Sequence, residues 1–313
     1  MPQPDAFRLK AAELLPLSVK SDRPGLLQAA GHLGAIVLGG ALIWQARGSW
    51  WMVPATLLQG WFIAFLFNVL HETAHQTAFR TRAFNYAMGH LAGFAILLPY
   101  EYYRAFHWDH HRYTQDPARD PELSVPPPPA GPALAWYWTG IPTWISRVRM
   151  LSLHGLRGIV RERWVPEAKR GLIAREARFY LAGYAIVLGA SLATQSLAVV
   201  WLWLLPVAVG QWLLRPYLLS EHTGCAYSAD MLENTRTTYT NAAVRFFAWN
   251  MPFHVEHHAY PAVPFHALPR LNGLLASHIR NTEQGYPAST AAALRFLASE
   301  EHAAALAKPT TSP

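Results

Sequence analysis

The chain has 313 residues, 52% of them hydrophobic and 14% charged, with a formal net charge of +7. Soluble domains average about 25% charged residues, so this composition argues against an ordinary water-soluble enzyme. The single cysteine, Cys225, excludes an internal disulfide and a cysteine-ligated iron–sulfur cluster, because each needs at least two thiols.

Two charge-free stretches, residues 24–46 and 48–71, predict a helical hairpin in the N-terminal part of the chain. Each is rich in apolar residues and long enough, as a helix, to cross the roughly 30 Å hydrocarbon core of a bilayer. We expect spans at about 24–46 and 50–70, joined by a turn at Arg47. Residues 1–23 mix both signs of charge and do not read as a cleaved signal peptide.

Two further uncharged segments follow. Residues 83–100 are marginal in length and end in Pro99-Tyr100-Glu101, which indicates a re-entrant or interfacial segment. Residues 179–214 are too long for one span and are interrupted near Gln195, which predicts a second hairpin with spans at about 178–195 and 197–219. We expect residues 304–313 to be disordered.

The predicted fold is therefore a single all-α membrane-embedded domain over residues 1–313. It has two transmembrane helical hairpins, about four spans, and a cytosolic helical cap. Residues 72–178 carry 14 Lys or Arg, whereas the hairpin turns carry only Arg47. By the positive-inside rule, this segment and both termini face the cytoplasm, which predicts an integral protein of the inner (cytoplasmic) membrane. Because membrane topology accounts for the basic segment, we expect no nucleic-acid partner.

Three histidine clusters dominate the rest of the sequence. They are HETAH with His71 and His75, HWDHH with His107, His110 and His111, and HVEHH with His254, His257 and His258. Residues three and four apart share one face of a helix, so each cluster presents its imidazoles together. The predicted topology puts all three clusters on one side of the membrane. His222 follows the last span on that same side and is a ninth candidate ligand, whereas a ligand role for His266 stays open.

The number of histidines indicates which metal centre they form. A catalytic zinc takes about three protein ligands, whereas eight or nine histidines suffice for two ions that keep open positions. We expect two iron ions, cycling between Fe²⁺ and Fe³⁺. Ligating histidines usually donate their second N–H to a carboxylate or carbonyl. Glu72, Asp120 and Glu256 are the main candidates for that orienting role.

The segments HETAH, HWDHHRYTQDPARDPEL and HVEHHAYP resemble the membrane fatty acid desaturase and hydroxylase superfamily over about residues 26–270, and most closely its acyl-lipid and sphingolipid desaturases. The resemblance implies a non-haem di-iron oxidoreductase that uses dioxygen as co-substrate to introduce a double bond into a lipid taken from the bilayer. It assigns the eight histidines of the three clusters as metal ligands, and His222 matches a further ligand of acyl desaturases. The chain carries no reductant motif of its own, so an external electron donor such as ferredoxin is expected.

Three alternatives remain open at this point. A hydroxylase or ketolase of the same superfamily, acting on a lipid or carotenoid, shares the same clusters. The first cluster also reads as HExxH, the zinc protease motif in which Glu72 acts as general base. A membrane metal transporter or metallochaperone is the non-enzymatic alternative, although its ligands would be expected near the bilayer midplane.

Overall fold

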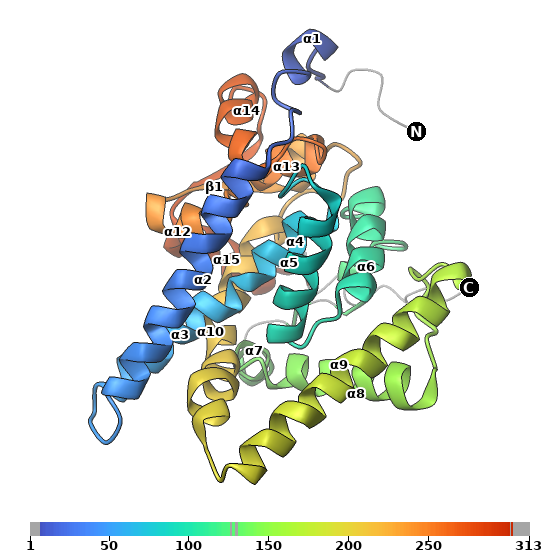
Figure 1. Ribbon diagram of the computed structural model, residues 1–313. Helices are drawn as coiled ribbons and strands as arrows, with labels where there is room; N and C mark the ends of the chain where they lie inside the picture. Colours follow the sequence, from blue (N-terminus) through green and yellow to red (C-terminus); the bar gives the residue numbers. More distant parts are fainter. Residues whose placement is uncertain (1–6, 126, 129–130, 301, 303–313) are drawn as a thin grey trace.

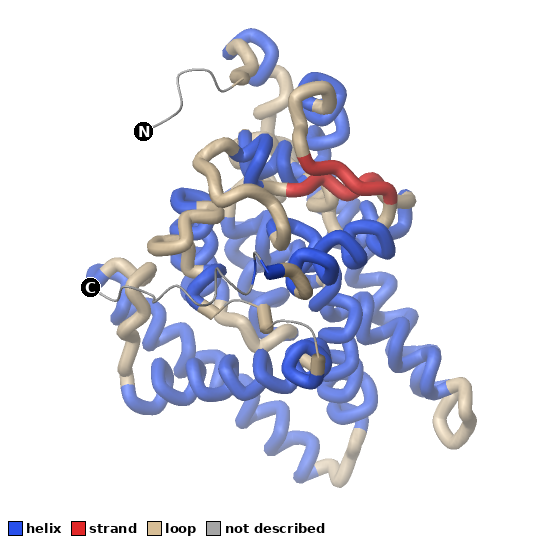
Figure 2. Tube along the Cα trace, turned by 180° about the vertical axis from the view of Figure 1, so that it is seen from behind, coloured by secondary structure: helices blue, strands red, loops and turns tan. Residues whose placement is uncertain are grey.

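A computed structural model of the chain describes residues 7–125, 127–128, 131–300 and 302. The described part is mostly helical, with one pair of short strands at its edge (Figures 1 and 2). The helices before residue 160 are α1 (Ala11–Leu14), α2 (Asp22–Gln45), α3 (Met52–Ala64), α4 (Leu66–Ala74), α5 (Arg82–Ala95), α6 (Tyr100–Tyr113), η1 (Glu122–Ser124), α7 (Pro132–Trp138) and α8 (Ile141–Arg157). The later elements are α9 (Glu167–Ala193), the π-helical turn η2 (Val200–Leu204), α10 (Leu205–His222), α11 (Met231–Asn234), β1 (Arg236–Tyr239), α12 (Ala242–Phe247), α13 (His254–Ala259), η3 (Phe265–Ala267), α14 (Leu268–Leu275), β2 (Asn281–Gln284) and α15 (Tyr286–Leu297).

Three helical segments in the described residues are long and apolar enough to cross a membrane. They are Asp22–Gln45 (α2), Met52–Ala74 (α3 continued by α4) and Val200–His222 (η2 continued by α10). The first two form the predicted N-terminal hairpin. Its turn contains Gly48 at φ +78°, and the Arg47 guanidinium lies 3.3 Å from the centre of the Trp44 ring. In Figure 1 this turn and the α9–η2 connection both lie at the lower end of the molecule, away from α13 and α14.

The second hairpin differs from the expectation in its first arm. The span predicted at about 178–195 lies within α9, which begins at Glu167 and is not among the three candidate spans. Charged residues continue along this helix as far as Arg178, so only its C-terminal half is apolar. That half exposes Phe179, Ile186 and Leu192. The structure thus supports three of the four predicted spans by length and composition.

The segment predicted to be re-entrant or interfacial forms α5 and the turn that follows it. At 1.5 Å per residue, the 14 residues of α5 extend only about 21 Å, which is too short to cross a bilayer. The helix packs along α4 instead. The tail expected to be disordered, residues 304–313, lies outside the described residues.

The helices that lead to the site pack closely against each other. Helices α3 and α10 approach at Gly60 and Gly210, where a Cβ atom added to Gly210 would lie 2.4 Å from the Gly60 carbonyl oxygen. Such small residues let two apolar helices come into backbone contact. The largest core cluster contains Leu70 on α4, Tyr100 on α6 and Leu268 on α14. It holds the ends of the apolar helices against the C-terminal part of the chain.

The two strands attach the C-terminal segment to this core. Strands β1 and β2 lie side by side (Figure 2). They pair in parallel, with Arg236 opposite Asn281. The Thr237 hydroxyl donates to Glu256 Oε2 at 2.6 Å and accepts from the Val255 backbone N–H at 3.3 Å. Helix α13 is therefore held in place by side-chain contacts with β1.

Candidate metal centre

Four helices bring the predicted ligands together in the interior. Helix α4 ends at the first cluster, α6 carries the second, α13 carries the third, and α10 ends at His222. All nine of the predicted histidines are buried: His71, His75, His107, His110, His111, His222, His254, His257 and His258. The three sequence clusters and the histidine after the last apolar helix thus converge in one place.

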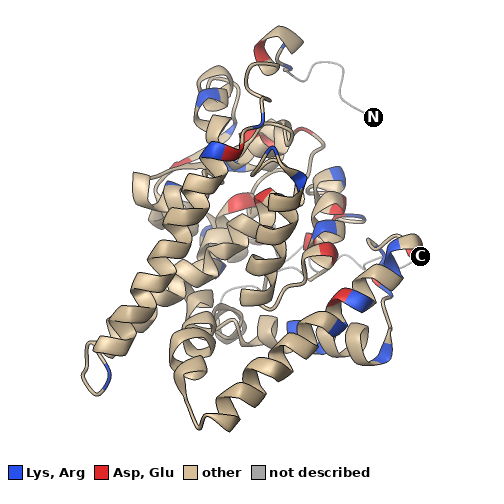
Figure 3. Cartoon of the chain, viewed as in Figure 1, with Lys and Arg blue, Asp and Glu red and all other residues tan. Residues whose placement is uncertain are grey.

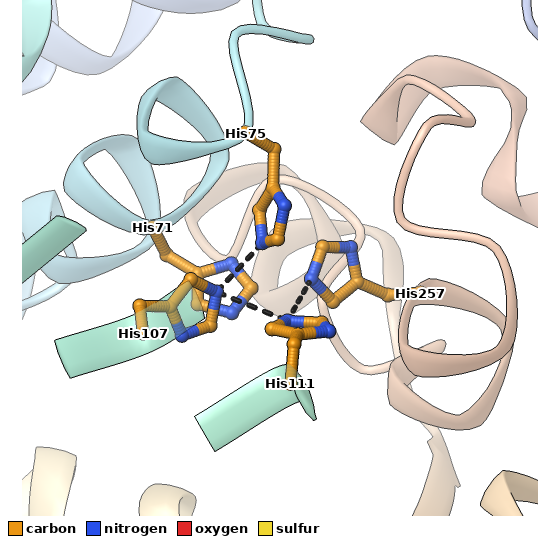
Figure 4. Close-up of side chains that lie close together, drawn as sticks. All are labelled: His71, His75, His107, His111 and His257. Atoms are coloured by element: carbon orange, nitrogen blue, oxygen red, sulfur yellow. Dashed lines mark hydrogen bonds between the residues drawn. The ribbon is translucent and has the colours of Figure 1, made fainter. Parts of the chain in front are cut away.

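Five of these side chains form one set, which we call the five-histidine group: His71, His75, His107, His111 and His257 (Figure 4). One ligand atom from each lies within 4.8 Å of all the others. His107 Nε2 is 2.7 Å from His75 Nε2 and 3.1 Å from His111 Nε2. Two nitrogens that bind one ion at about 2.1 Å, at right angles, lie about 3.0 Å apart. The spacing in this group therefore suits a shared metal ion.

A second set, the three-histidine group, consists of His110, His222 and His258. His254 adjoins it, because its Nε2 atom lies 3.2 Å from His222 Nε2. On α6, the adjacent residues His110 and His111 belong to different groups. On α13, the same is true of the adjacent residues His257 and His258. The HxxHH pattern on each helix therefore contributes to both groups, which favours a centre of two ions.

The protonation states and unpaired atoms of these imidazoles fit metal binding. Burial lowers the pKa of His75 to about 3. Burial and the neighbouring imidazoles hold the pKa values of His107 and His111 well below the usual range, so the rings are neutral and keep a lone pair. Both ring nitrogens of His71 and Nε2 of His258 are buried without a hydrogen-bond partner among the described residues. Buried polar atoms are rarely left unpaired, and a bound ion would satisfy one nitrogen of each of these rings.

Asp120, one of the acids predicted to orient an imidazole, lies in hydrogen-bond contact with one. Its Oδ1 atom accepts a hydrogen bond from His110 Nδ1 at 2.9 Å, and its Oδ2 atom accepts from the Gln115 backbone N–H at 2.8 Å. The Glu122 carboxylate lies 3.2 Å from the same His110 nitrogen. Burial opposes charging of His110, but these two carboxylates raise its pKa above the usual value. The other ring nitrogen of His110 is left to face the three-histidine group.

The structure does not bring Glu72 or Glu256 to an imidazole. Glu72 is completely buried and accepts a hydrogen bond from the Phe265 backbone N–H at 3.0 Å. Glu256 accepts from Thr237 and from the Asn272 side-chain amide. Both carboxylates thus form hydrogen bonds with residues outside the histidine groups. These bonds connect α4 and α13 to other parts of the C-terminal segment.

Other residues that orient imidazoles were not predicted. His222 Nδ1 donates to the Asn234 carbonyl oxygen at 3.2 Å, and His258 Nδ1 donates to the Thr114 hydroxyl oxygen at 3.2 Å. Backbone carbonyls and hydroxyls carry no distinctive sequence signal, although Thr114 follows the second cluster by only three residues. His266 is half-buried and belongs to neither histidine group among the described residues.

A cavity of about 470 Å³ reaches both groups. His71, His107, His110, His222 and His254 form one part of its wall. Phe67, Tyr103, Phe106 and Met150 form apolar and aromatic parts of the wall, and polar residues of α8 and α10 also line the cavity. The volume lies within the range of about 300–1,000 Å³ that small-molecule sites occupy.

The family model described as "Fatty acid desaturase" matches residues 48–287, which include all three histidine clusters. The chain belongs to the fatty acid desaturase family. Membership in this family supports an oxidoreductase of the desaturase type and an integral membrane protein, in agreement with the three apolar helices.

Curated relatives carry desaturase names. The dihydrorhizobitoxine desaturase of Bradyrhizobium elkanii is 27% identical over 253 residues, which cover 76% of this chain and 70% of that protein. The chloroplastic omega-6 fatty acid desaturase of Spinacia oleracea is 24% identical over 253 residues, covering 72% of this chain and 54% of that protein. The sn-1 oleoyl-lipid 12-desaturase of Picosynechococcus is 30% identical over 95 residues, covering 30% of this chain and 26% of that protein.

Membership in the desaturase family also weighs against the zinc protease alternative. A zinc protease would need Glu72 beside the metal to activate water, whereas the structure engages this carboxylate with the Phe265 backbone. It would also leave two HxxHH helices without a role. The desaturase family accounts for all three clusters together.

Proposed function

We propose that this protein is a dioxygen-dependent di-iron desaturase that introduces a double bond into a fatty acyl or related chain. The observation that carries the proposal is the pair of buried histidine groups at the wall of one largely apolar cavity. Membership in the fatty acid desaturase family supports the reaction type. A hydroxylase or ketolase of the same superfamily would differ from a desaturase in its product, which would contain an added oxygen atom.

The five-histidine group would hold one iron, and the three-histidine group together with His254 would hold the other. When bound, two irons and dioxygen supply an oxidant able to remove hydrogen from an unactivated methylene. No side chain replaces this chemistry, because an alkyl C–H has no acidic proton for a general base to take. The imidazoles contribute neutral nitrogen ligands, and Asp120 keeps the His110 ring turned toward its group.

The cavity wall positions the chain to be oxidised. Tyr103 stacks on His107 with 5.2 Å between ring centres, and Phe67 lies 6.2 Å from the His71 ring centre. These aromatic faces line the cavity beside the two groups and would shield a bound chain from water. Which methylene stands next to the metals follows from how deep the chain enters.

The proposed topology puts the histidine groups on the cytoplasmic side of the inner membrane. The Met52–Ala74 and Val200–His222 helices both end at the groups, and the apolar half of α9 would enter the bilayer beside them. Figure 3 shows Lys and Arg along α8 and the first half of α9, whereas the lower parts of α2 and α3 carry charge only at their connecting turn. We propose that this basic surface receives an external electron donor such as ferredoxin.

The names of the relatives indicate different substrates. One acts on dihydrorhizobitoxine and two on fatty acyl or lipid chains. A fatty acyl or related chain from the bilayer is the substrate class we propose for this protein, because the cavity wall beside the histidines is apolar.

The test combines metal analysis of the purified protein with mass spectrometry of lipids formed under labelled dioxygen. We expect about two irons per chain and a product that has lost two hydrogens without gaining label. Labelled oxygen in the product would indicate hydroxylation or ketone formation. One zinc per chain with unchanged lipids would overturn the proposal. His257→Ala should abolish activity, while His278→Ala, which removes only a ring stacked on Phe7, should not.

A further inference from the structure

Two arginines are buried in the wall of the cavity that also reaches the histidines. Arg147 on α8 is 7% exposed and Arg215 on α10 is 8% exposed. They are the Lys or Arg side chains among its described lining residues, which also include the aromatic side chains of Tyr103 and Phe106. The wall of one cavity therefore contains histidines of both groups, aromatic side chains and two buried guanidinium groups.

Neither guanidinium is neutralised by an acid in the described part of the chain, where no carboxylate oxygen lies within 4.0 Å of either one. Arg147 Nη1 donates to the Ile96 carbonyl oxygen at 2.6 Å. The Arg215 guanidinium lies 5.6 Å from the centre of the Tyr137 ring, and its buried Nε–H has no hydrogen-bond partner among the described residues. Much of the donor capacity of the pair is thus unused.

The acids in the same cavity wall are engaged elsewhere. Glu122 interacts with Arg215 only at longer range, and its carboxylate contacts His110 at 3.2 Å. Glu221 lies 3.7 Å from His254 Nδ1. The third acid of the wall, Asp120, accepts a hydrogen bond from His110. All three carboxylates therefore contact histidines, and none of them forms an ion pair with either arginine.

Two like charges in one buried site are costly when no counter-ion is present. Burial, with a further contribution from the charge of Arg215, lowers the pKa of Arg147 to about 9. A guanidinium offers a planar fork of N–H donors that matches a carboxylate or phosphate, and a bound oxyanion would offset the repulsion between the two side chains. The wall of this cavity is built to receive such a group.

We propose that Arg147 and Arg215 bind the carboxylate of the substrate, so that the enzyme acts on a free acid whose chain extends toward the histidine groups. This inference rests on the proposed function. A lipid phosphate offers the same oxyanion chemistry. The cavity volume of about 470 Å³ favours a single chain with a compact head over a two-chain phospholipid. The distance between the arginine pair and the metals would then determine which methylene is oxidised.

The test measures equilibrium binding to the full-length protein, prepared without metal so that no turnover is needed. The probes are straight-chain fatty acids of graded length, their methyl esters, and a phosphatidylglycerol with the same acyl chains. We expect at least one acid to bind about tenfold or more tightly than its ester, because the ester forfeits charged hydrogen bonds. Arg147→Gln and Arg215→Gln should remove that preference and leave ester binding unchanged.

Two further variants control for folding and for general charge. Arg215→Lys keeps the charge and should retain part of the preference for the acid. Arg149→Gln removes an exposed charge two residues from Arg147 on the same helix and should behave as wild type. Equal binding of acid and ester, absence of acid binding, or preference for the phospholipid would overturn the proposal. Failure to desaturate an acid that binds in this way would count against the proposed function alone.

Discussion

His110 Nδ1 and Asp120 Oδ1 lie 2.9 Å apart in a part of the site where both side chains are buried. The same carboxylate accepts backbone N–H groups of Gln115 and Glu122, so it is fixed before any metal arrives. His110 and His111 are neighbours in sequence but face different histidine groups. Fixing the His110 ring therefore defines where one group ends and the other begins.

Asp120→Asn should weaken metal binding at the three-histidine group by about 10–100-fold, since partners of ligating histidines contribute that much. The expected readout is iron bound per chain during titration of the metal-free protein, in which the weaker site fills later. Asp109→Asn is the matched control, because Asp109 lies one residue before His110 and pairs only loosely with Arg112, at 3.9 Å. Identical titrations for both variants would contradict an orienting role for Asp120.

Single histidine substitutions should separate the two groups. His111→Ala removes a member of the five-histidine group, and His258→Ala removes a member of the other. Each variant should retain about one iron per chain, with a different spectroscopic signature for the ion that remains. Loss of both ions in both variants would mean that the groups bind metal only as a unit.

Turnover with a protein electron donor should depend on salt. The exposed residues Arg170 and Arg175 belong to the basic surface on α9, and an acidic carrier would be attracted to it. Raising ionic strength above about 0.1 M should slow turnover with ferredoxin but not with a small chemical reductant. Arg170→Glu should have the same selective effect, whereas Arg47→Glu, in the hairpin turn, should have none. Equal salt sensitivity with both donors would exclude this docking surface.

The α3–α10 contact should tolerate no additional side-chain atoms. In Gly210→Ala the new methyl group would lie 2.4 Å from the Gly60 carbonyl oxygen, so the helices must separate. We expect a loss of about 1–3 kcal/mol in unfolding free energy, measured by thermal unfolding in detergent. Gly189→Ala is the control, because nothing lies within 4 Å of the added atom. A Gly210→Ala protein as stable as that control would show that the helices do not pack this closely.

The spacing of histidines predicted the helices whose imidazoles converge, because i, i+3 and i, i+4 positions depend only on helix geometry. The position of His222 after an apolar helix was also sufficient to bring it to the site. By contrast, which imidazole faces which group depends on how α6 and α13 are rotated against each other. The contacts of Thr114 and Asn234 depend on that packing as well, so no local pattern predicts them.

Charges were harder to interpret from sequence. Arg147 belongs to the basic segment that the positive-inside rule assigns to the cytoplasmic side, and nothing local distinguishes it from the exposed Arg149. Only the tertiary structure buries one and exposes the other. The predicted span began at about residue 178, whereas α9 begins at Glu167. Charged residues end an apolar segment of the sequence, but they do not end a helix.

The parallel pairing of β1 with β2 has a consequence for biogenesis. Thr237 on β1 contacts α13, and within the described part of the chain β1 pairs with residues 281–284 alone. During synthesis, the strand that contacts the third histidine helix therefore gains its pairing partner only when residues 281–284 have been translated. We therefore expect a chain that ends before β2 to hold its third histidine cluster less firmly and to bind less iron than the full chain.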